Sequence, residues 1–103
     1  MAQTFVDAQI RDNKVVMFSK TFCPYCKMAK DSLASAGLKD YKVVELENHN
    51  MCAEIQDYLN KLTGARSVPR VFIGGKCIGG GSETKALQES GKLTTMLQQN
   101  GAM

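Results

Sequence analysis

The chain lacks several features that would place it in a specialised class. It has no tryptophan, one histidine and two prolines, and no apolar run is long enough to span a bilayer. No charged segment followed by an apolar one marks a secretory signal. The net charge of +3 is small, and no polybasic tail or basic stripe with interspersed aromatics indicates a nucleic-acid partner. We therefore expect a cytoplasmic protein that binds neither membranes nor nucleic acids.

The length and composition predict one globular unit. A chain of 103 residues can bury one hydrophobic core, so we expect a single domain over residues 1–103. Hydrophobic residues make up 44% of the sequence and charged residues 22%, which is ordinary for a globular protein. Such a core does not need stabilisation by disulfides, so the four cysteines fit a reducing compartment better than a secreted scaffold.

Two of the cysteines form a Cys-x-x-Cys motif, Cys23 to Cys26, between an apolar run and a helical pattern. This placement is typical of a thiol–disulfide redox site. Pro24 suits the first helical position, which makes Cys23 the N-cap residue, next to unpaired N–H groups and the positive helix end. Both features favour the thiolate, which is the nucleophile. We predict that Cys23 attacks the substrate disulfide and that Cys26, one turn deeper, resolves the resulting mixed disulfide.

Two other interpretations of the motif are open. A structural disulfide is one, although a three-residue spacing closes almost no loop and adds little stability. A zinc site is the other, because His49 and Cys52 supply a second pair at plausible ligand spacing. The Pro-Tyr dipeptide between the cysteines leads directly into a helix and favours the redox interpretation, so we expect no metal.

The apolar pattern predicts an α/β chain with alternating elements. In order, it predicts a helix over 2–11, a strand over 15–19, a helix from 24 to about 37, a strand over 41–47, a helix over 51–62, a hairpin of strands 71–73 and 76–78, a helix capped by Ser82 and a last helix after Gly91. The strand–helix–strand succession implies a parallel pair with a right-handed crossover.

Further candidate residues surround the hairpin. The bond before Pro69 is expected to be trans on base rates, since about 5–6% of such bonds are cis in folded proteins. Glycines 79–81 form either a plain loop or a place where a ligand approaches the backbone closely. Backbone N–H groups at Ser82 would bind an anion, and Glu83 could bind an ammonium group. Cys52 and Cys77 are interpreted as ordinary partly buried residues.

Taken together, these motifs resemble those of a dithiol glutaredoxin of the cytosolic animal type. The resemblance rests on Cys23-Pro24-Tyr25-Cys26, on Ser67-Val68-Pro69, and on Gly79-Gly80 followed by Ser82-Glu83. It extends over nearly the whole chain, including residues 55–59 and 64–66. Three positions depart from many relatives: Ser67 stands where threonine is common, Glu83 where aspartate is common, and Gly81 where some animal relatives have cysteine.

The resemblance implies a thioredoxin-like fold with a four-stranded mixed sheet flanked by helices. It implies a cis bond at Val68-Pro69, against the base rate, and a glutathione-dependent oxidoreductase that acts as a monomer on glutathionylated or disulfide-containing proteins. Lys20 and Gln56, with Arg66 as a further candidate, would hold the glycine carboxylate of glutathione, and the helix start at Ser82 the γ-glutamyl end. The implied glutathione-binding residues are Lys20, Tyr25, Gln56, Val68, Pro69, Ser82 and Glu83.

Two further hypotheses belong to other classes of protein. An iron–sulfur carrier would bridge two copies of Cys23 through glutathione, but Pro24 disfavours it because cluster-binding relatives usually have a small residue there. A non-enzymatic interaction domain would keep its function after Cys23 is replaced.

Overall fold

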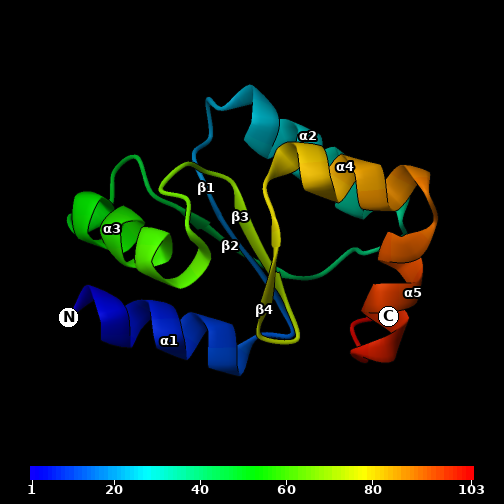
Figure 1. Cartoon of the computed structure of the whole chain (residues 1–103), viewed down its shortest axis with the longest axis horizontal. Coiled ribbons are helices and arrows are strands. Elements are labelled where there is room, and N and C mark those ends of the chain that lie inside the picture. Colours follow the sequence, from blue (N-terminus) through cyan, green and yellow to red (C-terminus); the bar gives the residue numbers. More distant parts are fainter.

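A computed structural model describes all residues, 1–103, as a four-stranded sheet flanked by five helices (Figure 1). The elements are α1 (Ala2–Asp12), β1 (Val15–Ser19), α2 (Pro24–Ser35), β2 (Lys42–Glu45), α3 (Cys52–Thr63), β3 (Arg70–Ile73), β4 (Lys76–Gly79), α4 (Gly81–Glu89) and α5 (Lys92–Gln99). The strand order is β2-β1-β3-β4, with β1 and β2 parallel and the other pairs antiparallel. The predicted mixed sheet is confirmed. None of the helices combines the length and the apolar character needed to cross a membrane.

The central strand β1 is buried along its whole length, as its uninterrupted apolar sequence predicts. Because successive side chains of a strand point to opposite faces, β1 contributes to two hydrophobic clusters. Val15 and Met17 pack with α2 and α5 on one face, and Val16 and Phe18 pack with α1 and α3 on the other. The sheet is thereby covered on both faces, and the C-terminal end of β1 leads into the Cys-x-x-Cys turn.

Most of the predicted element boundaries lie within one or two residues of those observed, but two predictions need correction. The second strand is shorter than expected and covers only residues 42–45. The prediction that Ser82 caps α4 is wrong, because Gly80 is the N-cap residue and Ser82 lies inside the first turn. The physical reason is the side chain of Glu83, whose Oε1 accepts a hydrogen bond of 2.7 Å from the Gly80 N–H. Glycine is an acceptable N-cap residue when the capping bond comes from N3.

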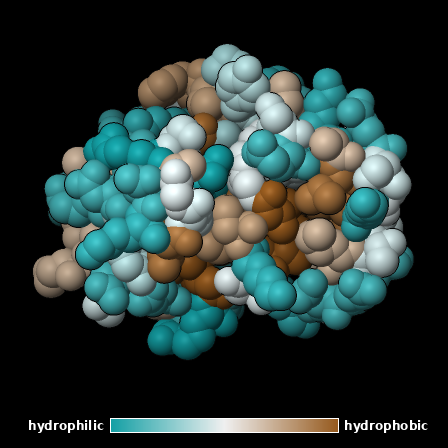
Figure 2. Space-filling view, viewed as in Figure 1, coloured by the Kyte–Doolittle hydropathy of each residue, from teal (hydrophilic) through white to brown (hydrophobic).

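Apolar residues also reach the surface on the face shown in Figure 2, most visibly right of its centre. Brown, hydrophobic side chains gather there over β4, α4 and α5. A groove in this region is lined by side chains from these elements and from the end of β3, including Ile73, Ile78, Leu87 and Met96. This groove lies on the hairpin side of the sheet, and neither Cys23 nor Cys26 lines it.

Candidate active site

Cys23 lies at the N-terminus of α2, where the sequence predicted an N-cap residue. Its backbone is extended, with φ −88° and ψ 121°, and Pro24 occupies the first turn. The Cys23 Sγ accepts a hydrogen bond from the Cys26 N–H at 3.4 Å, so the sulfur itself caps the helix. The side chain is partly exposed, and all four cysteines are free of disulfides.

Partial burial of Cys23 opposes its ionisation, but the surrounding donors outweigh that effect. The backbone N–H and thiol of Cys26 and the backbone of Tyr25 donate hydrogen bonds to the sulfur, and the ammonium of Lys20 adds a favourable charge. Together these contacts lower the pKa of the Cys23 thiol from its ordinary value. A lowered pKa and partial exposure are the two properties that make a cysteine a reactive nucleophile.

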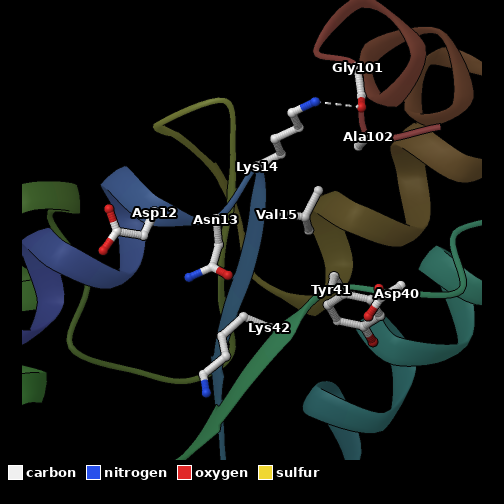
Figure 3. Close-up of a pocket in the computed structure, with 9 residues that line it drawn as sticks. All are labelled: Asp12, Asn13, Lys14, Val15, Asp40, Tyr41, Lys42, Gly101 and Ala102. Carbon is white, nitrogen blue, oxygen red and sulfur yellow. Dashed lines mark hydrogen bonds between the residues drawn. The ribbon is translucent and has the colours of Figure 1, made fainter.

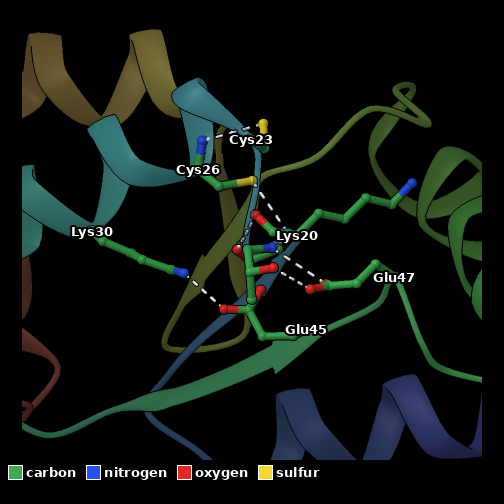
Figure 4. A network of polar contacts seen from close by, with 8 residues as sticks. Lys20, Cys23, Cys26, Lys30, Glu45 and Glu47 are labelled. Carbon is green, nitrogen blue, oxygen red and sulfur yellow. Dashed lines mark hydrogen bonds and ion pairs between the residues drawn. The ribbon is translucent and has the colours of Figure 1, made fainter.

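Cys26 has the opposite environment. Its side chain is fully buried, and this burial raises the pKa of the Cys26 thiol; a hydrogen bond with Cys23 and the charge of a Cys23 thiolate raise it further. The Lys20 N–H, at 3.4 Å from the Cys26 sulfur, and the Ser19 hydroxyl offset only part of this effect. Figure 4 shows the two cysteines with Lys20 below them and its side chain extending away from both sulfurs. The two thiols of the motif therefore differ in acidity.

The segment before β3 closes one side of this site. The Val68–Pro69 peptide bond is cis, so the trans expectation from base rates is wrong and the geometry implied by the resemblance is present. The carbonyl oxygen of Val68 lies 3.8 Å from the Cys23 Sγ and accepts a weak hydrogen bond from its thiol. The Pro69 carbonyl accepts a hydrogen bond of 2.8 Å from Arg70 Nε. The Val68 backbone thus borders the reactive sulfur.

Two candidate carboxylate-binding residues are engaged within the protein. Gln56 is buried; its Nε2 donates to the Arg66 carbonyl oxygen at 3.0 Å, and its Oε1 accepts from the Cys52 thiol at 3.4 Å. The Arg66 side chain forms an exposed ion pair of 2.8 Å with Asp57. Gln56 therefore anchors the backbone that precedes the cis proline. It keeps one amide N–H available.

The start of α4 packs against the first turn of α2. A Cβ placed on Gly81 would lie only 2.5 Å from the Tyr25 carbonyl oxygen, so the glycine permits a very close approach of the two helices. Ser82 and Glu83 follow on the exposed side of α4, and the Tyr25 side chain is 56% exposed beside the motif. The fold thereby brings Tyr25, Val68, Ser82 and Glu83 to the same end of the sheet as Cys23.

Sequence reasoning missed two acidic residues near the site. Glu47 binds Thr21 through the backbone N–H, at 3.3 Å, and through its hydroxyl, and these bonds lower the pKa of the Glu47 carboxyl. Glu45 forms an ion pair with Lys30 of α2 (Figure 4). The alternating charges of residues 42–47 were the available signal, but they also fit a solvent-exposed strand face.

The other candidate sites are not brought together. His49 accepts a hydrogen bond from the Met51 N–H at 3.0 Å through Nδ1, and no group of three or more His, Cys, Asp or Glu side chains could hold a metal ion. His49 and Cys52 therefore form no such group with Cys23 and Cys26. A polar hollow of about 370 Å³ lies where β1 and β2 begin, the end of the sheet away from the cysteines (Figure 3), and no cysteine lines it.

The fold and the paired thiols define a thiol–disulfide oxidoreductase with a thioredoxin-like fold. A family model described as glutaredoxin matches residues 15–78. Human glutaredoxin-1 is 50% identical over 105 residues, which cover 100% of this chain and 99% of that protein. The chain belongs to the glutaredoxin family, and it is a glutathione-dependent thiol–disulfide oxidoreductase. The family and activity implied by the sequence are confirmed.

Solved structures agree over the whole chain. Oxidized glutaredoxin 2 from Chlamydomonas reinhardtii has a TM-score of 0.96 and 47% identity, covering 99% of this chain and 95% of that chain. The protein in a buckwheat glutaredoxin–glutathione complex has a TM-score of 0.93 and 39% identity, covering 100% of this chain and 93% of that chain. The predicted thioredoxin-like fold is confirmed by these neighbours.

Proposed function

We propose that Cys23 is the nucleophile of this enzyme and Cys26 its resolving thiol. The observation that carries the proposal is the opposite perturbation of the two thiols: hydrogen bonds and a nearby ammonium lower the pKa of Cys23, whereas burial raises the pKa of Cys26. The partly exposed, more acidic sulfur is available to substrates, and the buried sulfur is kept for a second step within the protein.

On a glutathionylated protein, the Cys23 thiolate attacks the sulfur of the glutathione moiety. The mixed disulfide breaks, the protein leaves as a thiolate that takes up a proton, and a Cys23–glutathione disulfide forms. A second glutathione thiolate then attacks this disulfide, which releases oxidised glutathione and restores the Cys23 thiolate. This cycle requires only Cys23.

On a protein disulfide, Cys23 forms a mixed disulfide with one substrate sulfur. Cys26 loses its proton and attacks Cys23, so that an intramolecular disulfide forms and the substrate leaves with both sulfurs reduced. Two glutathione molecules afterwards reduce the Cys23–Cys26 disulfide. This cycle requires both cysteines, and glutathione supplies the electrons as a co-substrate.

Glutathione would lie across the surface between the motif, the cis proline and the start of α4. Two observations support this placement: the Val68 carbonyl lies beside the Cys23 sulfur, and the related buckwheat glutaredoxin was solved as a complex with glutathione. The Val68 backbone would pair with the tripeptide as a short strand beside Pro69. Tyr25 would pack on it from the first turn of α2.

Each charged group of glutathione would face a group of opposite charge or a hydrogen-bond donor on the protein. Lys20, with the free N–H of Gln56, would bind the glycine carboxylate. At the other end, N–H groups of the α4 N-terminus at Ser82 would bind the γ-glutamyl carboxylate. Glu83 uses Oε1 to cap Gly80, so Oε2 is the oxygen left for the γ-glutamyl ammonium.

Residues 1–103 would act as one glutaredoxin domain, as a monomer in the cytoplasm, on glutathionylated and disulfide-containing proteins. Sedimentation of the purified protein would test the monomer.

The residue roles are tested by two substitutions and two substrates. We expect Cys26→Ser to keep reduction of a glutathionylated peptide and to lose most reduction of a protein disulfide, whereas Cys23→Ser loses both. Glutathione-coupled turnover measures each activity. Equal loss of both activities in the Cys26→Ser variant would contradict the division of roles.

A further inference from the structure

A partly buried ion pair lies beneath the two cysteines. Lys30 follows Cys26 by four residues on α2, so the two side chains share one face of the helix. Its Nζ lies 2.7 Å from Glu45 Oε2 on β2, and both side chains are only 31% exposed (Figure 4). The pair therefore joins the helix that carries the motif to the neighbouring strand.

Glu45 also adjoins the strand end that surrounds the Cys26 sulfur. In the parallel register, Glu45 is the partner of Ser19, the last residue of β1. Ser19 is fully buried; its hydroxyl donates to the Lys20 carbonyl oxygen at 3.5 Å and counteracts part of the rise in the pKa of Cys26. Cys26 and Lys30 of α2, Ser19 of β1 and Glu45 of β2 thus come from three adjacent elements.

Fold stability alone gives little reason for this arrangement. Removing two charges from water costs free energy, and the cost is recovered only if their other polar atoms are also satisfied. Glu45 Oε1 is buried and has no hydrogen-bond partner. A buried acceptor left unpaired in a native fold calls for an explanation such as a role in chemistry.

The ammonium interacts with the resolving thiol. A hydrogen bond and the charge of Glu45 raise the pKa of Lys30 against the opposing effect of burial, and the charge of a Cys26 thiolate raises it further. Attraction between opposite charges acts on both partners, so the ammonium, one helical turn from Cys26, in turn favours the Cys26 thiolate. The opposing charge is that of Cys23, and it disappears once Cys23 is bound in a mixed disulfide.

Other charged groups lie near the Lys30–Glu45 pair and the motif cysteines. The guanidinium of Arg70, on β3, donates to the Pro69 carbonyl oxygen and is not among the groups that act on Cys26 or Lys30. The titratable groups that act on Cys26 or Lys30 are Cys23, Tyr41, Glu45 and Glu47, whereas the Lys20 ammonium acts on Cys23.

We propose that Lys30, held in place by Glu45, is a positioning residue that stabilises the Cys26 thiolate during resolution of the mixed disulfide on Cys23. The inference rests on the proposed role of Cys26. In this step the Cys26 thiol gives its proton to water, and the thiolate attacks the Cys23 sulfur. The Cys23–Cys26 bond forms as the bond from Cys23 to its partner sulfur breaks, and the departing thiolate takes up a proton.

The step can be observed in a single turnover. The reduced full-length protein is mixed with oxidised glutathione and quenched with acid, and mass spectrometry follows first the Cys23–glutathione disulfide and then its closure to the Cys23–Cys26 disulfide. We expect Lys30→Met to move the pH profile of the closure rate upward by about one unit. Closure at neutral pH would then be about tenfold slower.

Three further variants separate an electrostatic role from a structural one. Lys30→Arg keeps the charge and should restore the profile. Glu45→Gln keeps an acceptor for Lys30 but removes the negative charge, so its profile should move to lower pH. Lys27→Met removes a lysine of the same helix whose ion pair with Asp31 is exposed to solvent. This variant should leave the pH profile of the closure rate unchanged.

The outcomes distinguish this inference from the function on which it rests. If Cys26→Ser still loses bound glutathione at the wild-type rate without added thiol, the role of Cys26 is wrong. Suppose that Cys26→Ser keeps its bound glutathione, as expected. If the pH profile of the closure rate is then the same in Lys30→Met as in the wild type, the role of Lys30 is wrong. Shifts of the same sign in Lys30→Met and Glu45→Gln, or an equal shift in Lys27→Met, would also overturn it.

Discussion

Gly79 connects β4 to the start of α4, and its substitution by alanine should be among the most damaging small changes in this chain. Its φ of +117° lies in a region that residues with a side chain rarely adopt. A Cβ there would lie 2.7 Å from both Cβ and Cγ of Glu83, the side chain that caps α4. Gly79→Ala therefore combines backbone strain with a steric clash.

The two contributions can be estimated separately. A left-handed backbone costs a residue with a Cβ about 1–2 kcal/mol. Overpacking against well-packed neighbours costs about 1–3 kcal/mol more. We thus expect Gly79→Ala to lower the free energy of unfolding by about 2–5 kcal/mol, a large part of the stability of a typical domain.

Gly75→Ala is the matched control. Gly75 has a φ of +85°, and no atom lies within 4 Å of its added Cβ, so this variant carries the strain without the clash. Urea unfolding followed by circular dichroism measures both variants. Because the clash displaces Glu83, Gly79→Ala should also raise KM for glutathione, whereas Gly75→Ala should not. If Gly79→Ala costs no more free energy than Gly75→Ala, the close packing of Glu83 over Gly79 is wrong.

Three more predictions concern Cys23, Lys20 and Thr84. Because the pKa of Cys23 is lowered, its thiolate persists below the pH at which a free cysteine protonates; alkylation of Cys23 by iodoacetamide should stay fast as pH falls until it passes that lowered pKa. Labelling no faster than that of a cysteine in an unfolded peptide would refute this. Lys20→Gln should mainly raise KM for a glutathionylated peptide, and an unchanged KM would place the carboxylate elsewhere. Thr84→Val removes a buried hydrogen bond of 2.8 Å to the Gly80 carbonyl and should cost about 1 kcal/mol in urea unfolding, with an unchanged midpoint as the contradicting result.

Local chemistry explains why the sequence alone predicted that Cys23 caps the helix that begins at Pro24. A proline at the first helical position and a cysteine before it place the sulfur at the helix N-terminus, whatever packs around it. The same holds for the buried run of β1 and for the hairpin, whose two-glycine turn is a short-range signal. These features depend on neighbours a few residues apart, and the structure confirms their positions.

The start of α4 shows where local signals failed. Ser82 is a better N-cap residue than glycine by propensity, yet the N-cap is Gly80 and the helix begins two residues earlier than predicted, at Gly81. The close packing of Gly81 against the Tyr25 carbonyl and the Glu83 bond to Gly80 decide that boundary. The contact of Gly81 depends on how α4 packs against α2, which no short window of sequence contains, whereas the Glu83 bond joins residues three apart.

The sequence by itself determined the two-cysteine helix start and the buried strand before it, because each rests on residues adjacent in the chain, and it determined the family through several such short motifs. Only the tertiary structure decided that Cys26 is fully buried, and that Lys30 and Glu45 meet beneath it across fifteen residues of sequence. The reason is physical: burial and Coulomb interactions depend on distances through space, and the packing of α2 on the sheet sets those distances.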